Sequence, residues 1–341
     1  MDIENIGFET INLGHGSGGE LTRNLLDKII FSTFSNPYLD KKHDGSIVSF
    51  NGKIAISTDS FVITPIFFKG GNIGELAVHG TVNDVAMCGA IPKYLSLAFI
   101  IEEGLKVEEF IKIVHSIKKV ADESGVLIIT GDTKVVERGK GDKIFINTTG
   151  FGEVHPKARI SVHNIKEGDK ILVNGFIAQH GMAIMSEREG LEFESTIESD
   201  STNLNFLVND LLDEFGEKIR LLRDPTRGGL GTVLNEIAND ISKGVFIKEK
   251  TIPVEKQVAA ACEMLGLDPM YVANEGVFLV IIDPSVEKEV LKLMRNHAKG
   301  KNSALIGEIT NEHPNKVVME SLIGGKRIVS PLVGEQLPRI C

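Results

Sequence analysis

Short apolar runs recur along the chain, and each has the length and the residue types of a buried β-strand. They cover residues 53–58, 94–101, 126–130, 143–149, 170–175 and 277–282. Runs of four to eight residues that are rich in Val, Ile and Phe are typical of strands. The pattern therefore predicts a strand at each of these places.

A helical period lies between the second and third runs. After Leu105, apolar residues recur at steps of three and four: Phe110, Ile111, Val114, Ile117 and Val120. This spacing places them on one face of a helix, and Gly125 provides a stop. The fold class is therefore mixed α/β (α+β).

The chain of 341 residues is long enough for two domains. A polar, Pro-containing stretch at 153–170 ends just before a new strand. We expect an N-terminal domain of residues 1–155 and a C-terminal domain of residues 156–310. Residues 311–341 contain three prolines and short strand-like pieces but no long period, so we expect an extension that lies on the surface or moves freely.

Composition narrows the function classes. The formal net charge of −10 makes a nucleic acid a poor default partner. No apolar run approaches the roughly 20 residues of a membrane span, and the first ten residues do not resemble a signal peptide. The three widely spaced cysteines give neither a disulfide framework nor a metal motif, so we expect a cytoplasmic protein.

A glycine-rich stretch, "GHGSGGELTRNLLDKII" at 14–30, precedes a helical pattern. Exposed backbone amides at a helix start attract phosphate. The spacing of its glycines fits G-x-G-x-x-G, but no clean βαβ unit follows, which argues against a dinucleotide fold. A flexible turn with a helix cap is the structural alternative. His15 and His180 both stand beside glycines and are further candidates for phosphate contact, whereas no histidine spacing predicts zinc.

Isolated acids stand at strand ends and on a helix. Asp59 and Asp132 follow apolar runs, Asp224 lies in "RDPTRGGL", and Asp84 interrupts an apolar helical pattern. Several such acids can jointly hold Mg²⁺ and with it phosphates, although Asp132 and Asp224 could instead cap turns. A bound cation would compensate the carboxylate of Asp84.

The segment 130–143 carries four bases that could close over a polyphosphate, namely Lys134, Arg138, Lys140 and Lys143, of which Arg138 and Lys140 suit a solvated loop better. No P-loop string is present. The C-terminus is an extended arm, because Pro338 disfavours a helix, and it ends in the thiol of Cys341. Cys88 and Cys262 stand in apolar helical patterns and are expected to be buried.

Seven strings taken together identify the chain as similar to the HypE family of hydrogenase-maturation carbamoyl dehydratases, within the PurM-like (aminoimidazole ribonucleotide synthetase-like) superfamily. They cover nearly the whole chain: "HGSGG", "TDSFVITPIFFKGGNIGELAVHGTVNDVAMCGA", "TGDTKVVERG", "INTTGFG", "DPTRGGL", "ANEG" and the terminal "PRIC". The resemblance implies a two-domain PurM-like fold that dimerises through its N-terminal mixed sheets in a barrel-like interface, with ATP held between the chains.

The resemblance also implies a reaction. The carbamoyltransferase HypF loads a carbamoyl group onto the terminal cysteine, here Cys341, and ATP with Mg²⁺ drives its dehydration to a thiocyanate. The HypC–HypD complex then accepts the cyanide for the iron of [NiFe]-hydrogenase. The tail would act as a swinging arm.

The matching strings assign roles to individual residues. The resemblance places His15, Gly16, Gly18, Gly19, Asn83, Asp132 and Asn147 at the nucleotide, and Asp59, Asp84 and Asp224 at the metal, with Asp44 as a loosely matching fourth ligand. It puts Lys134 and Glu275 near the reacting group, and which of them is the base stays open.

Two rival functions remain. One is another PurM-like enzyme that acts on a free metabolite, such as an amidine-forming ligase or a selenophosphate synthetase; the latter carry a reactive residue near the N-terminus, whereas the first cysteine here is Cys88. The other is a scaffold whose terminal thiol binds a metal or a partner, although a lone thiolate is a poor metal site.

Overall fold

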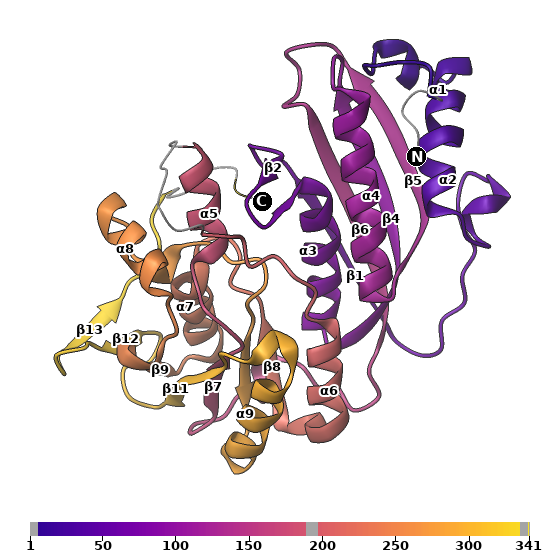
Figure 1. Cartoon of the computed structure of the whole chain (residues 1–341). Helices are drawn as coiled ribbons and strands as arrows, with labels where there is room; N and C mark the ends of the chain where they lie inside the picture. Colours follow the sequence, from indigo (N-terminus) through magenta and orange to yellow (C-terminus); the bar gives the residue numbers. More distant parts are fainter. Residues whose placement is uncertain (1–5, 189–196, 335–339, 341) are drawn as a thin grey trace.

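The computed structural model describes residues 6–188, 197–334 and 340, and it contains two main sheets, each with apolar clusters of its own (Figure 1). The first is mixed and has the strand order β1-β6-β4-β5. Only β4 and β5 run parallel. Its strands are β1 (Ile54–Phe61), β4 (Ala90–Glu102), β5 (Leu127–Val136) and β6 (Ile144–Val154). All four strands predicted in this half of the chain are confirmed.

Helices α3 (Ile73–Met87) and α4 (Val107–Ser124) pack on one another and cover the inner face of this sheet (Figure 1). The predicted apolar stripe of α4 is buried, and the helix ends at Gly125, whose φ of 72° is left-handed. A two-stranded hairpin of β2 (Phe67–Phe68) and β3 (Gly71–Asn72) precedes α3.

Glycines on the inner face of β6 let α3 approach the sheet closely. A Cβ atom added to Gly152 would lie 2.6 Å from Cγ1 of Val85, and one on Gly150 would lie 2.8 Å from Cγ2 of Thr81. The hydroxyl of Thr148, two residues before Gly150 on the same face, donates to the carbonyl of Ala77 at 3.0 Å. Helix α3 is therefore held at a fixed, short distance from β6.

In the part of the chain that the structure describes, no helix packs on the outer face of the first sheet. Large apolar side chains project from one end of it: Ile56 is 55% exposed, and Ile54 and Ile91 are exposed near it. Ile100 is exposed further along β4, beyond two rows that carry threonine, serine and asparagine. A contiguous apolar surface on a sheet is typical of an interface. The described residues form an open four-stranded sheet rather than a closed barrel, so a barrel-like arrangement would require a second chain.

The second sheet has seven strands in the order β13-β12-β9-β11-β7-β10-β8. They are β7 (Lys170–Val173), β8 (Ile219–Arg223), β9 (Gly244–Lys248), β10 (Leu279–Ile282), β11 (Ala304–Thr310), β12 (Val317–Glu320) and β13 (Lys326–Val329). The predicted strands at 170–175 and 277–282 are confirmed as β7 and β10. The helices of this half are α5 (Gln179–Arg188), α6 (Asn205–Phe215), α7 (Gly229–Ile241), α8 (Lys256–Leu265) and α9 (Glu287–Asn296).

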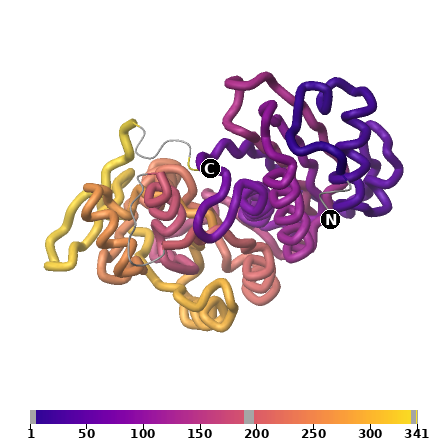
Figure 2. Tube along the Cα trace, turned by 45° about the horizontal axis from the view of Figure 1, so that its top comes forward, coloured from indigo at the N-terminus to yellow at the C-terminus, as the bar shows by residue number. Residues whose placement is uncertain are grey.

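The stretch after residue 311 differs from our expectation of a surface segment. Strand β12 pairs with β9, and its Val317 and Met319 side chains are fully buried. Two alternating apolar residues thus suffice to bring a short strand into a sheet that already offers a free edge. In Figure 2 these strands lie at the opposite end of the molecule from the N-terminal helices.

Candidate active site

The glycine-rich loop packs against β5, the edge strand of the first sheet. The loop contains a turn of 3-10 helix (Leu13–Gly16), and α1 (Glu20–Leu25) begins after Gly19, which is its N-cap. A Cβ atom on Gly16 would lie 2.6 Å from the backbone nitrogen of Val135, so only glycine allows this approach. The backbone N–H of Gly18 donates to the hydroxyl of Thr22 at 2.9 Å.

His15 lies beneath this loop. Its side chain is fully buried, Nδ1 accepts the backbone N–H of Asn12 at 3.1 Å, and its ring centroid lies 4.3 Å from that of Phe8. Burial lowers the pKa of the imidazole. The prediction that His15 contacts phosphate finds no support in this position, because the ring caps the turn and does not line the cavity beside it.

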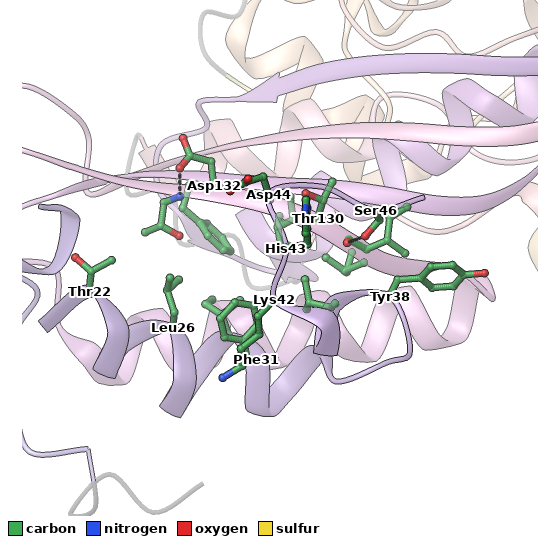
Figure 3. Close-up of a pocket in the computed structure, with 18 of the residues that line it drawn as sticks. Thr22, Leu26, Phe31, Tyr38, Lys42, His43, Asp44, Ser46, Thr130 and Asp132 are labelled. Atoms are coloured by element: carbon green, nitrogen blue, oxygen red, sulfur yellow. Dashed lines mark hydrogen bonds between the residues drawn. The ribbon is translucent and has the colours of Figure 1, made fainter. Parts of the chain in front are cut away.

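A cavity of about 620 Å³ opens between the N-terminal helices and β5 (Figure 3). Its helical side is largely apolar and is formed by Leu26, Ile30, Phe31, Tyr38 and Leu39. Its strand side combines the polar residues Asp132 and Lys134 of β5 with apolar ones, and the remaining polar and glycine positions of the lining include Gly16, Gly18, Asp44 and Thr22 of α1. An apolar wall opposite a few polar groups is typical of a ligand pocket.

Asp132 and Lys134 form an ion pair at this cavity. Nζ of Lys134 lies 2.6 and 2.7 Å from the two carboxylate oxygens of Asp132. Both residues lie inside β5, which continues past the apolar run to Val136, so the prediction that Asp132 follows the strand was wrong. Lys143, another of the four candidate bases, pairs instead with Glu109 at 2.9 Å.

Asn147 shares the outer face of the sheet with Asp132. Strand pairing sets Ser60, Asn147, Ala98 and Asp132 opposite one another in a single row across the four strands. Nδ2 of Asn147 donates to the carbonyl of Asp59 at 2.8 Å and to the hydroxyl of Ser60 at 2.9 Å. Two strand spacings, about 10 Å, therefore separate Asn147 from Asp132.

A cluster of acids lies on the inner side, where the two sheets meet. Asp59 belongs to β1, which runs to Phe61, so this acid too lies within a strand and not after it. The hydroxyl of Ser57 donates to Asp84 of α3 at 2.7 Å. Asp84 also shares a hydrogen bond with Asp224, and burial followed by the charge of Asp84 raises the pKa of Asp224 to about 7. Such a pair retains a proton unless a cation compensates it.

Glu275 lies beside this cluster and is only 5% exposed. Burial, followed by the charges of Asp200 and Asp224, raises the pKa of its carboxyl well above the ordinary value. The carboxylate of Asp200 accepts the backbone N–H groups of Glu275 at 3.2 Å and of Gly276 at 3.1 Å. Sequence reasoning missed Asp200, because it stands in a polar run, 198–203, that has the composition of an ordinary loop.

Two asparagines in the matching strings have structural contacts. Oδ1 of Asn274 accepts the backbone N–H of Ala178 at 2.7 Å, and Nδ2 donates to the carbonyl of Pro225 at 2.8 Å. Asn83 is buried, with Nδ2 bonded to the carbonyl of Thr202 at 2.9 Å and Oδ1 to the N–H of Leu204 at 2.8 Å. These backbone contacts give no support to a nucleotide-binding role for Asn83.

The four predicted metal ligands do not form one group. Asp59, Asp84 and Asp224 influence one another electrostatically, whereas Asp44 lines the cavity beside β5. Within residues 6–188, 197–334 and 340, no three His, Cys, Asp or Glu side chains converge closely enough to hold a metal ion. Lys134 and Glu275 likewise lie apart, the first at the edge strand and the second in the acidic cluster.

The chain end returns to the boundary between the two halves. Ile340 is 4% exposed and belongs to the apolar core of the first half, and its carbonyl oxygen contacts Nε2 of His180 at 2.5 Å. Cys341 lies outside the described residues. Of the other cysteines, Cys262 is buried as expected, but Cys88 is exposed at the end of α3, so that prediction was wrong.

Comparison with known proteins bears on these observations. The model for the AIR synthase related protein N-terminal domain matches residues 42–154, and that for the C-terminal domain matches residues 166–320. The carbamoyl dehydratase HypE of Bradyrhizobium diazoefficiens is 48% identical over 342 residues, which cover 100% of this chain and 98% of that protein. The chain belongs to the HypE family.

Solved structures of HypE proteins extend this similarity to three dimensions. A crystal structure of the hydrogenase maturation protein HypE in complex with ATP superimposes with a TM-score of 0.93 at 45% identity, and covers 96% of this chain and 99% of that one. A HypE–HypF complex matches with a TM-score of 0.80 at 44% identity over 90% of this chain and 99% of that one. The two-domain PurM-like fold is therefore confirmed.

None of the helices in the described part of the chain is both long enough and apolar enough to span a membrane.

Proposed function

We propose that the protein is an ATP-dependent carbamoyl dehydratase that matures hydrogenase, as its HypE relatives are named. The observation that carries the proposal is the burial of Ile340, which brings the chain end to His180, next to the segment that holds Glu275. The relatives do not favour an enzyme that acts on a free metabolite. The substrate would be an S-carboxamide on Cys341 of the same chain.

The chemistry requires removal of one oxygen and two protons from the carboxamide. Transfer of the γ-phosphoryl group of ATP to the carboxamide oxygen makes that oxygen a good leaving group. Loss of the nitrogen protons then expels phosphate and leaves a thiocyanate, so the oxygen of the eliminated water ends in phosphate. A buried carboxyl with a raised pKa is a stronger base once ionised, which suits Glu275 as the proton acceptor.

The acidic cluster suits a divalent cation chemically. Burial raises the pKa of both Asp84 and Asp224, since little compensates their charges, and oxygen ligands of this kind are those that Mg²⁺ prefers. Asp84 and Asp224, which share a hydrogen bond, would be the first ligands, and Asp59, which in this structure is not close enough to complete a group of three, would join them when the ion binds. When bound, Mg²⁺ neutralises phosphate charge. Asp44 lies in the cavity and fits this set less well.

We place ATP at the cavity beside β5. The apolar wall around Leu26 and Phe31 suits a purine, and the loop amides of Gly16 and Gly18 suit phosphate. Lys134 would exchange its contact with Asp132 for a phosphate oxygen or the carboxamide. Asn147, in the same row as Asp132, would contact the same ligand only across the outer face of the sheet.

A homodimer would bring the separate groups together. The outer face exposes Ile54, Ile56, Ile91 and Ile100, and two such faces could pack against one another. The cavity of one chain would then approach the acidic cluster of the other. HypF, which forms a complex with a HypE relative, is the carbamoyl donor in this proposal, a HypC–HypD complex is the cyanide acceptor, and the cytoplasm is the compartment.

Intact-protein mass spectrometry tests the proposal. The chain is incubated with the carbamoyltransferase, carbamoyl phosphate and ATP, and then with further ATP and Mg²⁺. We expect a carbamoyl adduct that loses one water, and neither species in Cys341→Ala. A thiol that stays unmodified while ATP is bound would contradict the proposal.

A further inference from the structure

His180 connects the chain end to the interior of the second half. It is the second residue of α5 and is fully buried. Nε2 contacts the carbonyl oxygen of Ile340 at 2.5 Å, and Nδ1 contacts the hydroxyl of Ser199 at 2.8 Å. The ring of Phe68 stands edge-on to the imidazole at 5.7 Å. Both ring nitrogens therefore have partners.

The partners fix which nitrogen carries the proton. A carbonyl oxygen can only accept, so Nε2 must be the donor to Ile340. The hydroxyl of Ser199 accepts the backbone N–H of Ser201 at 3.1 Å, which leaves its own proton free to be donated to Nδ1. Burial lowers the pKa of His180 to about 4, so the ring is neutral and can hold this single tautomer.

The same segment joins His180 to Glu275. Asp200 lies between Ser199 and Ser201, and its carboxylate accepts the backbone N–H of His180 as well as those of Glu275 and Gly276. A negative charge beside the first turn of α5 also stabilises this helix through its dipole. One carboxylate thus ties the backbone of His180 to the backbone of Glu275. Ala178, two residues before His180, has a left-handed φ of 74°, and Asn274 holds its N–H.

We propose that His180 is a positioning residue that sets the register of the C-terminus, by holding the carbonyl of Ile340, and with it the last peptide unit before the thiol, beside the segment that carries Glu275. The inference rests on the proposed function for its catalytic consequence. The hydrogen bond from Nε2 holds the carbonyl oxygen of Ile340, and burial holds its side chain. The sulfur that carries the carboxamide therefore lies one residue beyond a fixed carbonyl. Neither loading by the carbamoyltransferase nor ATP binding uses this contact.

Two variants, each with one inserted glycine, distinguish the effect of the spacing between Ile340 and Cys341 from the effect of tail length. An insertion between Ile340 and Cys341 moves the thiol away from the fixed carbonyl, whereas an insertion directly after Gly334 lengthens the tail equally and preserves the spacing. In single turnovers of the loaded full-length chain, we expect the first to slow loss of water at least about tenfold and the second to leave it nearly unchanged. Equal rates in the two variants would overturn the proposal.

Substitutions of His180 test the contact itself. His180→Leu removes the donor, while His180→Gln keeps an N–H at the Nε2 position. The rate at which carboxypeptidase removes Cys341 and Ile340 should rise about tenfold in His180→Leu and much less in His180→Gln, because proteolysis follows the open population. Circular dichroism and thermal unfolding check that both variants fold. Ser199→Ala removes the hydroxyl that binds Nδ1, so that the imidazole is no longer restricted to one tautomer, and it should give an intermediate digestion rate.

The digestion needs neither ATP nor a carbamoyl donor. If the wild-type chain shows no loss of water, the proposed function fails, and the ratio of digestion rates still decides whether His180 holds Ile340. If His180→Leu is digested no faster than wild type, the positioning role fails, whatever the dehydration assay shows. Slower loading of His180→Leu by the carbamoyltransferase would also overturn it, since the defect would then precede dehydration.

Discussion

Nδ2 of Asn274 donates a hydrogen bond to the carbonyl oxygen of Pro225 across 2.8 Å, and this contact fastens the segment that carries Glu275 to the segment that carries Asp224. The same side chain accepts the N–H of Ala178 in front of α5. One fully buried amide thus holds three segments that are far apart in the sequence.

Asn274→Ala should lower the free energy of unfolding by about 2–4 kcal/mol, because it leaves buried backbone groups without partners. Denaturant unfolding measures the change. Asn203→Ala is the matched control: its side chain makes one exposed bond to the carbonyl of Glu123, and its cost should stay below about 1 kcal/mol. Equal costs would show that the buried amide adds nothing beyond an ordinary surface contact.

Glu275→Gln should abolish dehydration of the loaded thiol while leaving its loading intact. If Glu275 accepts a proton, the wild-type rate rises with pH through a pKa well above that of an ordinary glutamate. Single-turnover rates between pH 5 and 9 give this profile. A Lys134→Met variant that retains the rising limb would support Glu275 as the base, whereas loss of the limb in that variant would assign it to Lys134.

Ile56→Asp should convert a dimer into a monomer and reduce ATP-dependent dehydration. The substitution puts a charge into the apolar outer face, where a packed partner would desolvate it. Light scattering during size-exclusion chromatography reports the mass. Ile323→Asp is the control, since Ile323 is 95% exposed between β12 and β13, and it should change neither quantity. A monomeric wild type with full activity would contradict the dimeric arrangement.

His79→Gln should make the protein less sensitive to acid. Burial lowers the pKa of His79 to about 3, so the unfolded chain binds a proton near pH 6.5 that the folded chain does not. The resulting stability is present above pH 6.5 and is lost as the pH falls below it. Between pH 7 and 5, the wild type should lose about 2 kcal/mol that the variant keeps. If denaturant titrations show that wild type and variant lose the same free energy of unfolding between pH 7 and 5, the pH dependence does not come from His79.

The regular elements could be predicted because their patterns are local. The stripe of α4 and the apolar runs of β4 and β6 depend on side chains within one segment, and all were found. Strands β1 and β5 extend further than predicted, since pairing with a neighbour carries the polar residues Asp59 and Asp132 into the ladder. Short strand-like pieces were expected after residue 311, but the place of β12 inside the second sheet was not, because it depends on the free edge of β9.

The connections of the site could not be read from the sequence. Asp200 accepts a backbone N–H and Ser199 contacts an imidazole nitrogen, each on a residue more than 18 positions away, and the polar run that holds them has no distinctive pattern. The matching strings did mark Asn274 and Glu275, but they gave no sign that Asn83 binds backbone. Sequence motifs and their spacing indicate which residues could belong to the site, whereas the contacts of each side chain depend on the folded structure.

The glycines on the inner face of β6 have a consequence for metal affinity. Asp84 is carried by α3, and the depth of that helix is set by the absence of side chains at Gly150 and Gly152. An added methyl group at Gly152 would push α3 outward and widen the gap between Asp84 and Asp59 of β1. Gly152, which contacts neither nucleotide nor ion, would thus control the spacing of the acidic cluster. Its substitution would weaken metal binding in the way that loss of a metal ligand does.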